Sequence, residues 1–291
     1  MGITPSKSRR GSNNSTTSDD DGAEGDPFIQ QGQSYIEKSQ EQQHFLRAIW
    51  DGNFVSPVRE PLSAGGAKVL DVCCGSGVWL CDNATDFQNS KFVGIDIVQR
   101  LPNERPRNVE FIVADALQRF PFDDDCFDFV YLQFVTLWFT EQQLIETILP
   151  ECVRVLKPGG WFELSDCDAH LYTKGQLGTI LNIYFAQQLK KRNFNAFVGN
   201  HLEFFLQNTG KVQKIQKREL ELTIPNLNVF GNGMGDIACK MFAQIGINSG
   251  IELGVLKESD AEKITVDSMR EAHERRAYFK FYRVIAEKIS S

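Results

Sequence analysis

The chain has 291 residues, of which 42% are hydrophobic and 24% charged, a composition typical of a soluble protein with a sizeable core. This length suits one large domain or two small ones. The formal net charge of -7 argues against a general nucleic-acid binder, which needs a basic face. No apolar run is long enough to cross a membrane, and the N-terminus lacks the apolar core of a secretory signal. We therefore expect a protein of the cytoplasm or nucleus with no membrane span and no direct nucleic-acid binding.

The cysteines predict neither a disulfide framework nor a metal site. There are seven, an odd number, and none forms a Cys-x-x-Cys pair. Reduced, buried thiols are the better interpretation, as is usual inside cells. The set comprises Cys73, Cys74, Cys81, Cys126, Cys152, Cys167 and Cys239.

Residues 1–27 form a polar segment rich in Ser, Asn, Asp and Gly. Such a segment buries too little apolar surface to offset the entropy of ordering, so we predict a disordered tail. Its Arg-Arg-Gly-Ser sequence ending at Ser12 matches a basophilic kinase site, although chance occurrence in a polar tail is the favoured explanation. Residues 28–66 are predicted to form a helical cap, in which Gln40–Trp50 places Phe45, Ile49 and Trp50 near one helical face.

The segment Lys68–Trp79 combines a strand, a sharp turn and the start of a helix. Val69, Leu70 and Val72 predict a short buried strand, and the small residues 73–77 allow the chain to turn out of a sheet. A helical pattern starts at Val78. A turn of this kind brings backbone N–H groups close to a ligand at the sheet edge where open α/β folds bind cofactors.

Further strands follow this turn in a regular order. Lys91–Asp96 ends in a carboxylate roughly 20 residues after the turn, where a nucleotide-type cofactor needs an acceptor for its ribose hydroxyls. Val109–Asp115 also ends in a carboxylate. Asp125–Gln133 and Leu156–Leu164 predict a fourth and a fifth strand. Alternating buried strands and helical segments predict a mostly parallel sheet with helices on both faces.

A family resemblance rests on five motifs in order within residues 43–168. They are Val-Leu-Asp-Val-x-Cys-Gly-Ser-Gly, Gly-Ile-Asp, Ala-Asp-Ala, Phe-Asp-Phe-Val and Arg-Val-Leu-Lys-Pro-Gly-Gly. This set resembles the class I S-adenosylmethionine-dependent methyltransferases, and within them fungal proteins similar to the velvet-complex methyltransferase-like regulators. The resemblance implies an α/β, Rossmann-like seven-stranded sheet with an antiparallel C-terminal strand and helical lid insertions.

The same resemblance divides the chain after the cap into two parts. Residues 67–168 form the expected cofactor-binding core, and residues 169–291 a substrate lid with C-terminal strands that complete the sheet. A core-facing helical stripe is expected before the fifth strand, at Leu144, Ile148, Val153 and Leu156. Later patterns predict helices at 176–192, 203–207 and 231–247, and strands at 212–224 and 278–287.

By resemblance, the first strand and its turn bind the cofactor S-adenosyl-L-methionine. Asp71 is expected near its cationic amino-acid end, and Cys73, Gly75 and Gly77 form the loop. Cys73 stands where relatives usually have the first glycine, and a positive φ there costs of order 1 kcal/mol. A reactive-thiol role for Cys73 or Cys74 is less favoured than packing of a small side chain.

The remaining cofactor contacts are also carried over by resemblance. Asp96, with Ile97 beside it, is expected to accept both ribose hydroxyls through strong charge-assisted hydrogen bonds. Asp115 and Ala116 match the adenine-contacting position. The methionine part of the cofactor is assigned to Gln133 and Phe134. Gln43, His44 and Trp138 are candidates for pocket walls, with structural packing an equal alternative.

The reaction implied is in-line displacement at the sulfonium methyl, in which positioning alone can supply roughly 7–11 kcal/mol. A general base is needed only for a poorly acidic acceptor. His170, with Asp166 and Asp168 nearby, is the candidate, although an isolated loop histidine is more often structural.

Three functions remain open from the sequence. The first is an enzyme that methylates a small or apolar acceptor. The second is a nuclear methyltransferase-like regulator of secondary metabolism, with weak or no catalysis and a protein partner bound through its tail or lid. The third is a NAD-binding dehydrogenase, disfavoured because Leu80 stands where Gly-x-Gly-x-x-Gly needs its third glycine.

Overall fold

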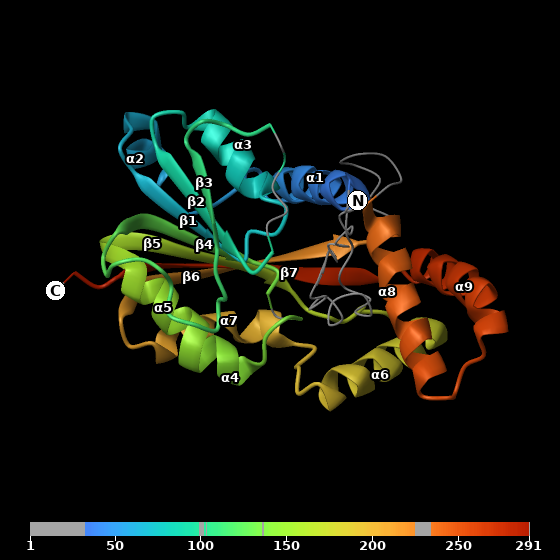
Figure 1. Ribbon diagram of the computed structural model, residues 1–291. Helices are drawn as coiled ribbons and strands as arrows, with labels where there is room; N and C mark the ends of the chain where they lie inside the picture. Colours follow the sequence, from blue (N-terminus) through green and yellow to red (C-terminus); the bar gives the residue numbers. More distant parts are fainter. Residues whose placement is uncertain (1–32, 99–101, 103, 136, 225–233, 291) are drawn as a thin grey trace, which may run out of the picture.

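The computed structural model describes residues 33–98, 102, 104–135, 137–224 and 234–290 (Figure 1). The predicted tail and Ser12 lie outside these residues. Within them, one sheet has the strand order β3-β2-β1-β4-β5-β7-β6. Its strands are β1 (Lys68–Val72), β2 (Lys91–Asp96), β3 (Val109–Val113), β4 (Phe127–Gln133), β5 (Leu156–Cys167), β6 (Val212–Thr223) and β7 (Tyr278–Lys288).

Strand direction confirms the predicted fold class. Neighbouring strands from β3 to β5 pair in parallel, whereas β7 is antiparallel to both β5 and β6. Because parallel strands have their carboxyl ends at one edge, the loops after β1, β2, β3 and β4 meet there. The strand order reverses at β1: β2 and β3 follow on one side of it, and β4 and β5 on the other. In open α/β sheets, ligands bind at such a topological switch point.

Helices cover both faces of the sheet, as expected (Figure 1). One face carries α1 (Gln33–Ile49), α2 (Arg59–Ala64) and α3 (Val78–Asp86). The other carries α4 (Glu141–Gln143), the π-helical turn η1 (Leu144–Ile148), α5 (Leu149–Val155) and α7 (Val198–Asn208). Beyond one end of the sheet lie α6 (Gln176–Lys191), α8 (Met234–Glu252), the short 3₁₀ turn η2 (Glu258–Asp260) and α9 (Ala261–Glu274).

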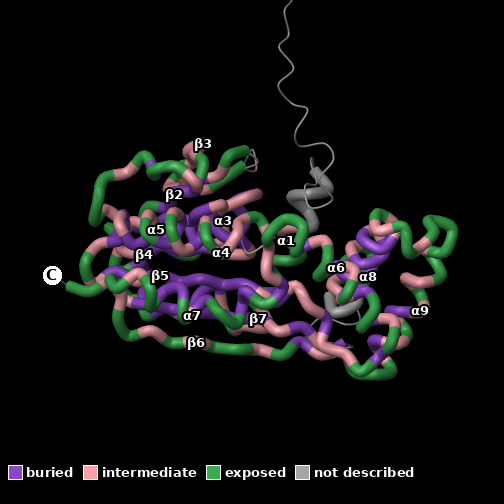
Figure 2. The backbone as a smooth tube through the Cα atoms, turned by 90° about the horizontal axis from the view of Figure 1, so that it is seen from below, coloured by how far each residue is buried: buried purple, intermediate pink, exposed green. Residues whose placement is uncertain are grey.

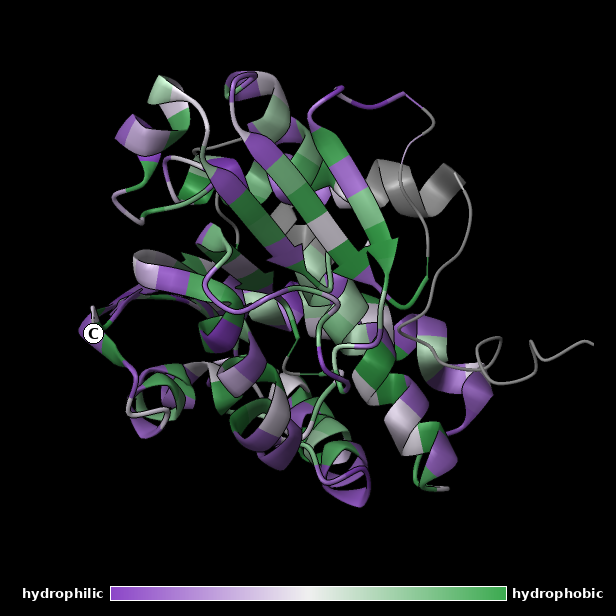
Figure 3. Ribbon diagram, turned by 60° about the vertical axis from the view of Figure 1, so that its left-hand side comes forward, coloured by the Kyte–Doolittle hydropathy of each residue, from purple (hydrophilic) through white to green (hydrophobic). Residues whose placement is uncertain are grey.

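Each of these layers encloses apolar side chains. Most residues of the central strands are buried (Figure 2), and the strands nearest the viewer carry mainly hydrophobic residues, whereas hydrophobic and polar residues alternate along the helices (Figure 3). The helical group has its own core, in which Phe185, Phe242 and Ile247 are buried with residues of α1 and the sheet end. This second core makes the helical group a separate layer rather than a set of loops.

The structure decides one ambiguous boundary and adds one helix to the prediction. Leu156 is predicted both at the end of the helical stripe and at the start of the fifth strand, and it begins β5, because its backbone is extended (φ -74°, ψ 135°). The Lys-Pro-Gly-Gly motif lies inside β5, as the predicted strand implies, and Gly159 adopts a φ of +76°. The helix α2 falls within the predicted helical cap of residues 28–66, whereas the sequence pattern does not predict α9, in which charged residues are frequent.

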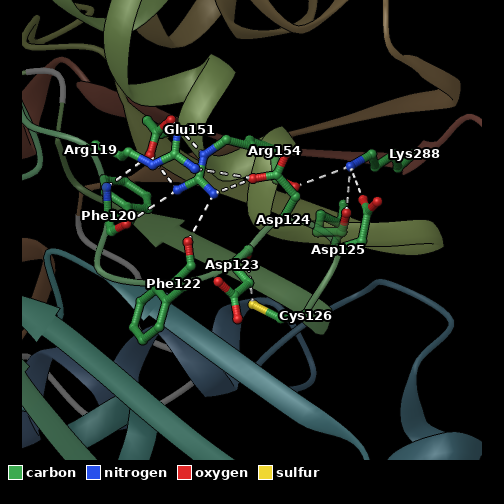
Figure 4. A network of polar contacts seen from close by, with 11 residues as sticks. Arg119, Phe120, Phe122, Asp123, Asp124, Asp125, Cys126, Glu151, Arg154 and Lys288 are labelled. Atoms are coloured by element: carbon green, nitrogen blue, oxygen red, sulfur yellow. Dashed lines mark hydrogen bonds and ion pairs between the residues drawn. The ribbon is translucent and has the colours of Figure 1, made fainter.

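Arg154 of α5 holds the loop that precedes β4 (Figure 4). Its guanidinium donates to both carboxylate oxygens of Glu151, each at 2.7 Å, and to Asp124 Oδ1 at 2.7 Å. It also donates to the backbone oxygens of Phe120 and Phe122. These bonds fix the chain between β3 and β4 at the edge opposite the predicted cofactor loop.

Candidate cofactor site

The turn after β1 has the left-handed backbone that small residues permit. Gly75 and Gly77 have φ values of +55° and +67°, and Gly77 is the residue that starts α3. Cys73 also has a positive φ, +57°. The cost expected for a positive φ at Cys73 therefore applies, because a side chain in this conformation is strained by of order 1 kcal/mol.

Gly94 of the Gly-Ile-Asp motif lets this turn pack on β2. A Cβ at Gly94 would lie 2.7 Å from Cys74 Sγ and 2.9 Å from Leu80 Cδ2, so any larger residue there would force these side chains to shift. The Cys74 backbone N–H donates to the Ile95 oxygen at 3.0 Å. The turn after β1 and the Gly-Ile-Asp motif therefore pack as one unit, because Cys74 occupies the space that a side chain at Gly94 would fill.

The Asp96 carboxylate is joined to the turn directly. Its Oδ2 accepts from the Gly75 N–H at 3.0 Å, and its Oδ1 accepts from the Val98 N–H at 3.1 Å. Asp115, after the neighbouring strand, accepts from the Leu117 N–H at 2.9 Å. Each oxygen named here keeps further lone-pair capacity for a hydroxyl donor, because an ionised carboxylate accepts about four hydrogen bonds.

Asp71 brings a buried carboxylate to the same edge. Its side chain is only 3% exposed, and burial, followed by the nearby Asp96, raises its pKa well above the usual range. A buried carboxyl beside another carboxylate is stabilised by a cation. The positive amino-acid end of the expected cofactor meets that requirement.

The Cys73 thiol lies near the three carboxylates of Asp71, Asp96 and Asp115, which affect its pKa. Burial raises its pKa, and Asp96, Asp71 and Asp115 raise it further, in that order. The thiol therefore stays protonated at neutral pH, which argues against a nucleophilic role. Cys74 behaves in the same way, with burial the largest cause and Asp71 the next.

An apolar rim lies beside the carboxylates. Ile97 is 65% exposed and Val113 is 60% exposed, and Val113 pairs with Asp96 in the register of β2 and β3. Ala116 is buried just behind. Large apolar side chains exposed next to polar acceptors suit a flat base such as adenine. The donors, carboxylates and apolar rim together fit S-adenosylmethionine.

Gln133 and Phe134 lie where β4 ends at the same edge. The Tyr131 hydroxyl donates to Gln133 Oε1 at 2.6 Å, which fixes the side-chain amide. Phe134 has a φ of +51°, and its N–H donates to the Ser165 oxygen at 3.0 Å. Its ring meets Phe281 edge-on at 6.4 Å between centroids. The chain thus turns sharply at Phe134, with its ring against β7.

His170 follows β5 and packs between aromatic rings. Its ring centroid lies 4.8 Å from that of Tyr172 and 4.9 Å from that of Phe197. Burial lowers its pKa, with Asp168 acting in the opposite direction, so the imidazole is neutral at pH 7 and able to accept a proton. The Asp168 carboxylate itself accepts from the hydroxyls of Tyr172 at 2.6 Å and Tyr282 at 2.8 Å.

The other candidates take different positions. Asp166 accepts from the backbone N–H groups of Val135 and Cys167, so it stabilises the turn after β4. Gln43 is buried and donates to Asn53 Oδ1 at 3.1 Å, whereas His44 is exposed. Trp138 is 44% exposed. Sequence reasoning missed Tyr131, although it lies two residues before Gln133 and hence on the same face of β4.

Two further observations concern the described residues. None of their helices combines the length and apolar character needed to cross a membrane. A hollow lined by Pro57, Lys157 and Trp161, among others, lies at the amino edge of the sheet, near the starts of β1 and β4. It faces away from the carboxyl edge and is not part of this site.

A Rossmann-like sheet with this turn and these carboxylates defines the class of nucleotide-cofactor proteins. Residues 69–160, the part of the chain that carries the five motifs, match the family described as "Methyltransferase domain".

Curated relatives include enzymes and regulators. An "N-methyltransferase verN" of Clonostachys rogersoniana is 32% identical, over 47% of this chain and 48% of the relative. A "Secondary metabolism regulator LAE1" of Cochliobolus heterostrophus is 33% identical, over 35% of this chain and 33% of the relative. The chain spans between a third and somewhat more than half of the length of these curated relatives. A solved phosphoethanolamine N-methyltransferase of Haemonchus contortus is 15% identical with a TM-score of 0.48, covering 91% of this chain and 62% of that one.

Proposed function

We propose that this protein is an S-adenosylmethionine-dependent methyltransferase. The observation that carries the proposal is that the turn after β1 and the end of β2 are joined. The Asp96 carboxylate accepts from the Gly75 N–H, and the absence of a side chain at Gly94 leaves room for Cys74. The match of residues 69–160 to the methyltransferase domain supports the same cofactor.

The roles of the chain's own residues follow from their chemistry. Asp96 would hold the ribose hydroxyls, Asp115 and Ala116 with Ile97 the adenine, and Asp71 the cationic end. Cys73, Gly75 and Gly77 supply the close backbone, and Gln133 and Phe134 border the methionine part. When bound, S-adenosylmethionine supplies a methyl group already activated by a sulfonium. The protein then has mainly to position the acceptor in line, which is worth roughly 7–11 kcal/mol.

The acceptor proposed is a small or apolar molecule that enters under α6, α8 and α9. Support comes from the apolar core of this helical layer and from a relative named as an N-methyltransferase. His170 would act as general base if the acceptor is a weakly acidic amine or hydroxyl, because its lowered pKa keeps the ring neutral. The cytoplasm is the proposed compartment.

A second candidate is a nuclear regulator of secondary metabolism with little or no catalysis. The observation that favours it is the similarity to proteins named secondary metabolism regulators from several fungi. In this alternative the N-terminal tail or the helical layer binds a protein partner. Nuclear localisation with a co-purifying partner and no turnover distinguishes it from the enzyme.

The first experiment is a thermal shift with S-adenosylmethionine, S-adenosylhomocysteine and NAD in parallel. A ligand at about 100 times its dissociation constant adds roughly 2.7 kcal/mol of stability, which is several degrees for a protein of this size. We expect shifts with both sulfur nucleosides and none with NAD. A shift with NAD alone would refute the proposal.

Asp96→Ala tests the site itself. Loss of the carboxylate removes both the ribose acceptor and the bond to the Gly75 N–H, so binding of S-adenosylhomocysteine should fall below detection by calorimetry. Asp123→Ala, at an exposed aspartate of the loop before β4, should leave binding unchanged. Equal affinities for both variants would contradict the assignment.

A further inference from the structure

A buried polar seam crosses the sheet behind the candidate site. Across neighbouring strands, Asp71 pairs with Tyr131, and Tyr131 with Glu163. Ser165 lies beside Gln133 in the next row. Tyr131 is fully buried at the centre of this seam. A buried hydroxyl here is costly unless it is hydrogen-bonded, so its partners are informative.

Hydrogen bonds give the Tyr131 hydroxyl a direction. Burial raises the pKa of Tyr131 most, so the phenol is protonated at neutral pH and able to donate. The phenol's own proton then goes to Gln133 Oε1, which lies 2.6 Å away. The amide oxygen of Gln133 is thereby engaged by Tyr131, and the amide NH₂ is the donor that the side chain can offer a ligand.

The Tyr131 ring is itself fixed from the other side. It stacks on Trp79 at 3.9 Å between centroids and an angle of 2°. The Trp79 indole N–H donates to the Asn53 oxygen at 2.9 Å. Asn53 also bonds Asn83 and Gln43, which connects α1 and α3 to this ring. Tyr131 therefore has little rotational freedom, and its hydroxyl is a preorganised anchor for Gln133.

We propose that Tyr131 is a positioning residue that sets Gln133 as a hydrogen-bond donor for the carboxylate at the amino-acid end of the cofactor. This proposal rests on the function proposed above. An amide that is free to flip would offer its oxygen to that carboxylate half of the time, which is repulsive. With Oε1 held by Tyr131, only the attractive orientation is presented.

The test compares two ligands that differ in the amino-acid end. S-adenosylhomocysteine carries the carboxylate, whereas 5′-methylthioadenosine keeps the nucleoside and lacks it. Tyr131→Phe keeps the ring stacked on Trp79 and removes only the hydroxyl. One lost hydrogen bond of about 0.5–1.5 kcal/mol corresponds to roughly two- to tenfold weaker binding. We expect this loss for S-adenosylhomocysteine and no change for 5′-methylthioadenosine, by calorimetry.

Two further variants separate positioning from a general effect on the fold. Tyr131→Phe in a Gln133→Ala background should cause no additional loss, because the group it positions is absent. Tyr282→Phe removes another buried hydroxyl, which donates to Asp168 at 2.8 Å, and should leave S-adenosylhomocysteine binding unchanged. Equal weakening of both ligands by Tyr131→Phe, or additive losses in the double variant, would overturn the proposal. If the wild-type protein binds neither ligand, the proposed function fails instead.

Discussion

Cys73 occupies a backbone conformation that glycine adopts freely and other residues adopt at a cost. Its φ is +57°, and its thiol packs against the core between the sheet and α5. The sequence motif alone marks this position as unusual, because relatives usually have glycine there. The motif does not say whether the backbone at Cys73 is ordinary or left-handed. The positive φ shows that it is left-handed, so the cysteine is strained.

Substitutions at this position should show that strain. In Cys73→Gly, relief of about 1–2 kcal/mol of left-handed strain is opposed by about 0.5–1 kcal/mol of extra backbone entropy. The free energy of unfolding should therefore rise by about 0–1.5 kcal/mol. Cys73→Val should lose about 1–3 kcal/mol, because a branched side chain fits a positive φ poorly.

Urea unfolding measures both changes. The control is Cys81→Val, the same substitution on the helical backbone of α3, which should cost less than about 1 kcal/mol. If valine is tolerated equally at both positions, the left-handed backbone at Cys73 is not a constraint.

Carboxylates that follow strands were easier to predict than the buried side chains behind them. Asp96 ends β2 and Asp115 comes two residues after β3, so a short apolar run followed by an acid reveals them. Tyr131 lies in the middle of a hydrophobic strand, and nothing in the sequence shows that its hydroxyl reaches Gln133 while Trp79 covers its ring. Contacts between elements far apart in the chain are set by packing, which local patterns do not contain.

At the scale of elements, α5 is tied to the loop before β4 by ion pairs rather than by apolar contacts alone (Figure 4). The hydrogen bond from Arg154 is the main cause that lowers the pKa of Glu151 below its ordinary value of 4.5. Because the folded-state pKa is the lower one, the stabilisation is present above pH 4.5 and is lost as the pH falls through the folded-state value.

Glu151→Gln should expose this pH dependence. At neutral pH, the variant should lose about 1.5–3 kcal/mol of unfolding free energy, the range for hydrogen bonds to charged groups. The difference from wild type should shrink as the pH is lowered below 4.5. Glu146→Gln, on the preceding π-helical turn and outside the Arg154 cluster, should differ from wild type by less than about 0.5 kcal/mol. A Glu151→Gln difference that stays constant on acidification would contradict the charge-based explanation.

The sequence predicts the bounds of an element well where its hydrophobic periodicity is strong. It predicts them poorly where the backbone conformation of a single residue sets the boundary. The alternation over 278–287 corresponds to β7, which runs Tyr278–Lys288. Leu156 has the spacing of a helical core residue, yet its backbone is extended and it pairs with Phe127 of β4. The helix α9 was missed because its apolar face, which carries Ile264, Met269 and Ala272, is narrow and interrupted in the sequence by charged residues.

At the scale of the whole molecule, a buried ion pair links the segment after α1 to strands β5 and β7. Arg283 of β7 and Glu163 of β5 are 1% and 0% exposed, with Arg283 Nε 3.7 Å from Glu163 Oε1. Glu163 also accepts from the backbone N–H groups of Val55 and Ser56. Arg283 donates to the backbone oxygens of Gly52 and Asn53. The segment after α1 is therefore anchored on the C-terminal part of the sheet.

Removing one partner of this ion pair should lower the free energy of unfolding more than removing both partners. Glu163→Gln leaves the Arg283 cation buried without a carboxylate, which should cost about 3–5 kcal/mol of unfolding free energy. Adding Arg283→Met removes that cation, so the double variant should recover at least half of the loss. Hydrogen exchange should show faster opening of backbone amides 52–58 in Glu163→Gln, because this segment is held by the same carboxylate.

The matched control is an ion pair between β6 and β7. Glu219→Gln breaks the contact with Lys280, in which the side chains are 37% and 22% exposed, and it should cost less than about 1 kcal/mol. If the double variant at 163 and 283 recovers none of the stability lost in Glu163→Gln, the two charges are not coupled. Residues 52–58 would then depend on their hydrogen bonds alone, and their amides would open equally in Glu163→Gln and in the double variant.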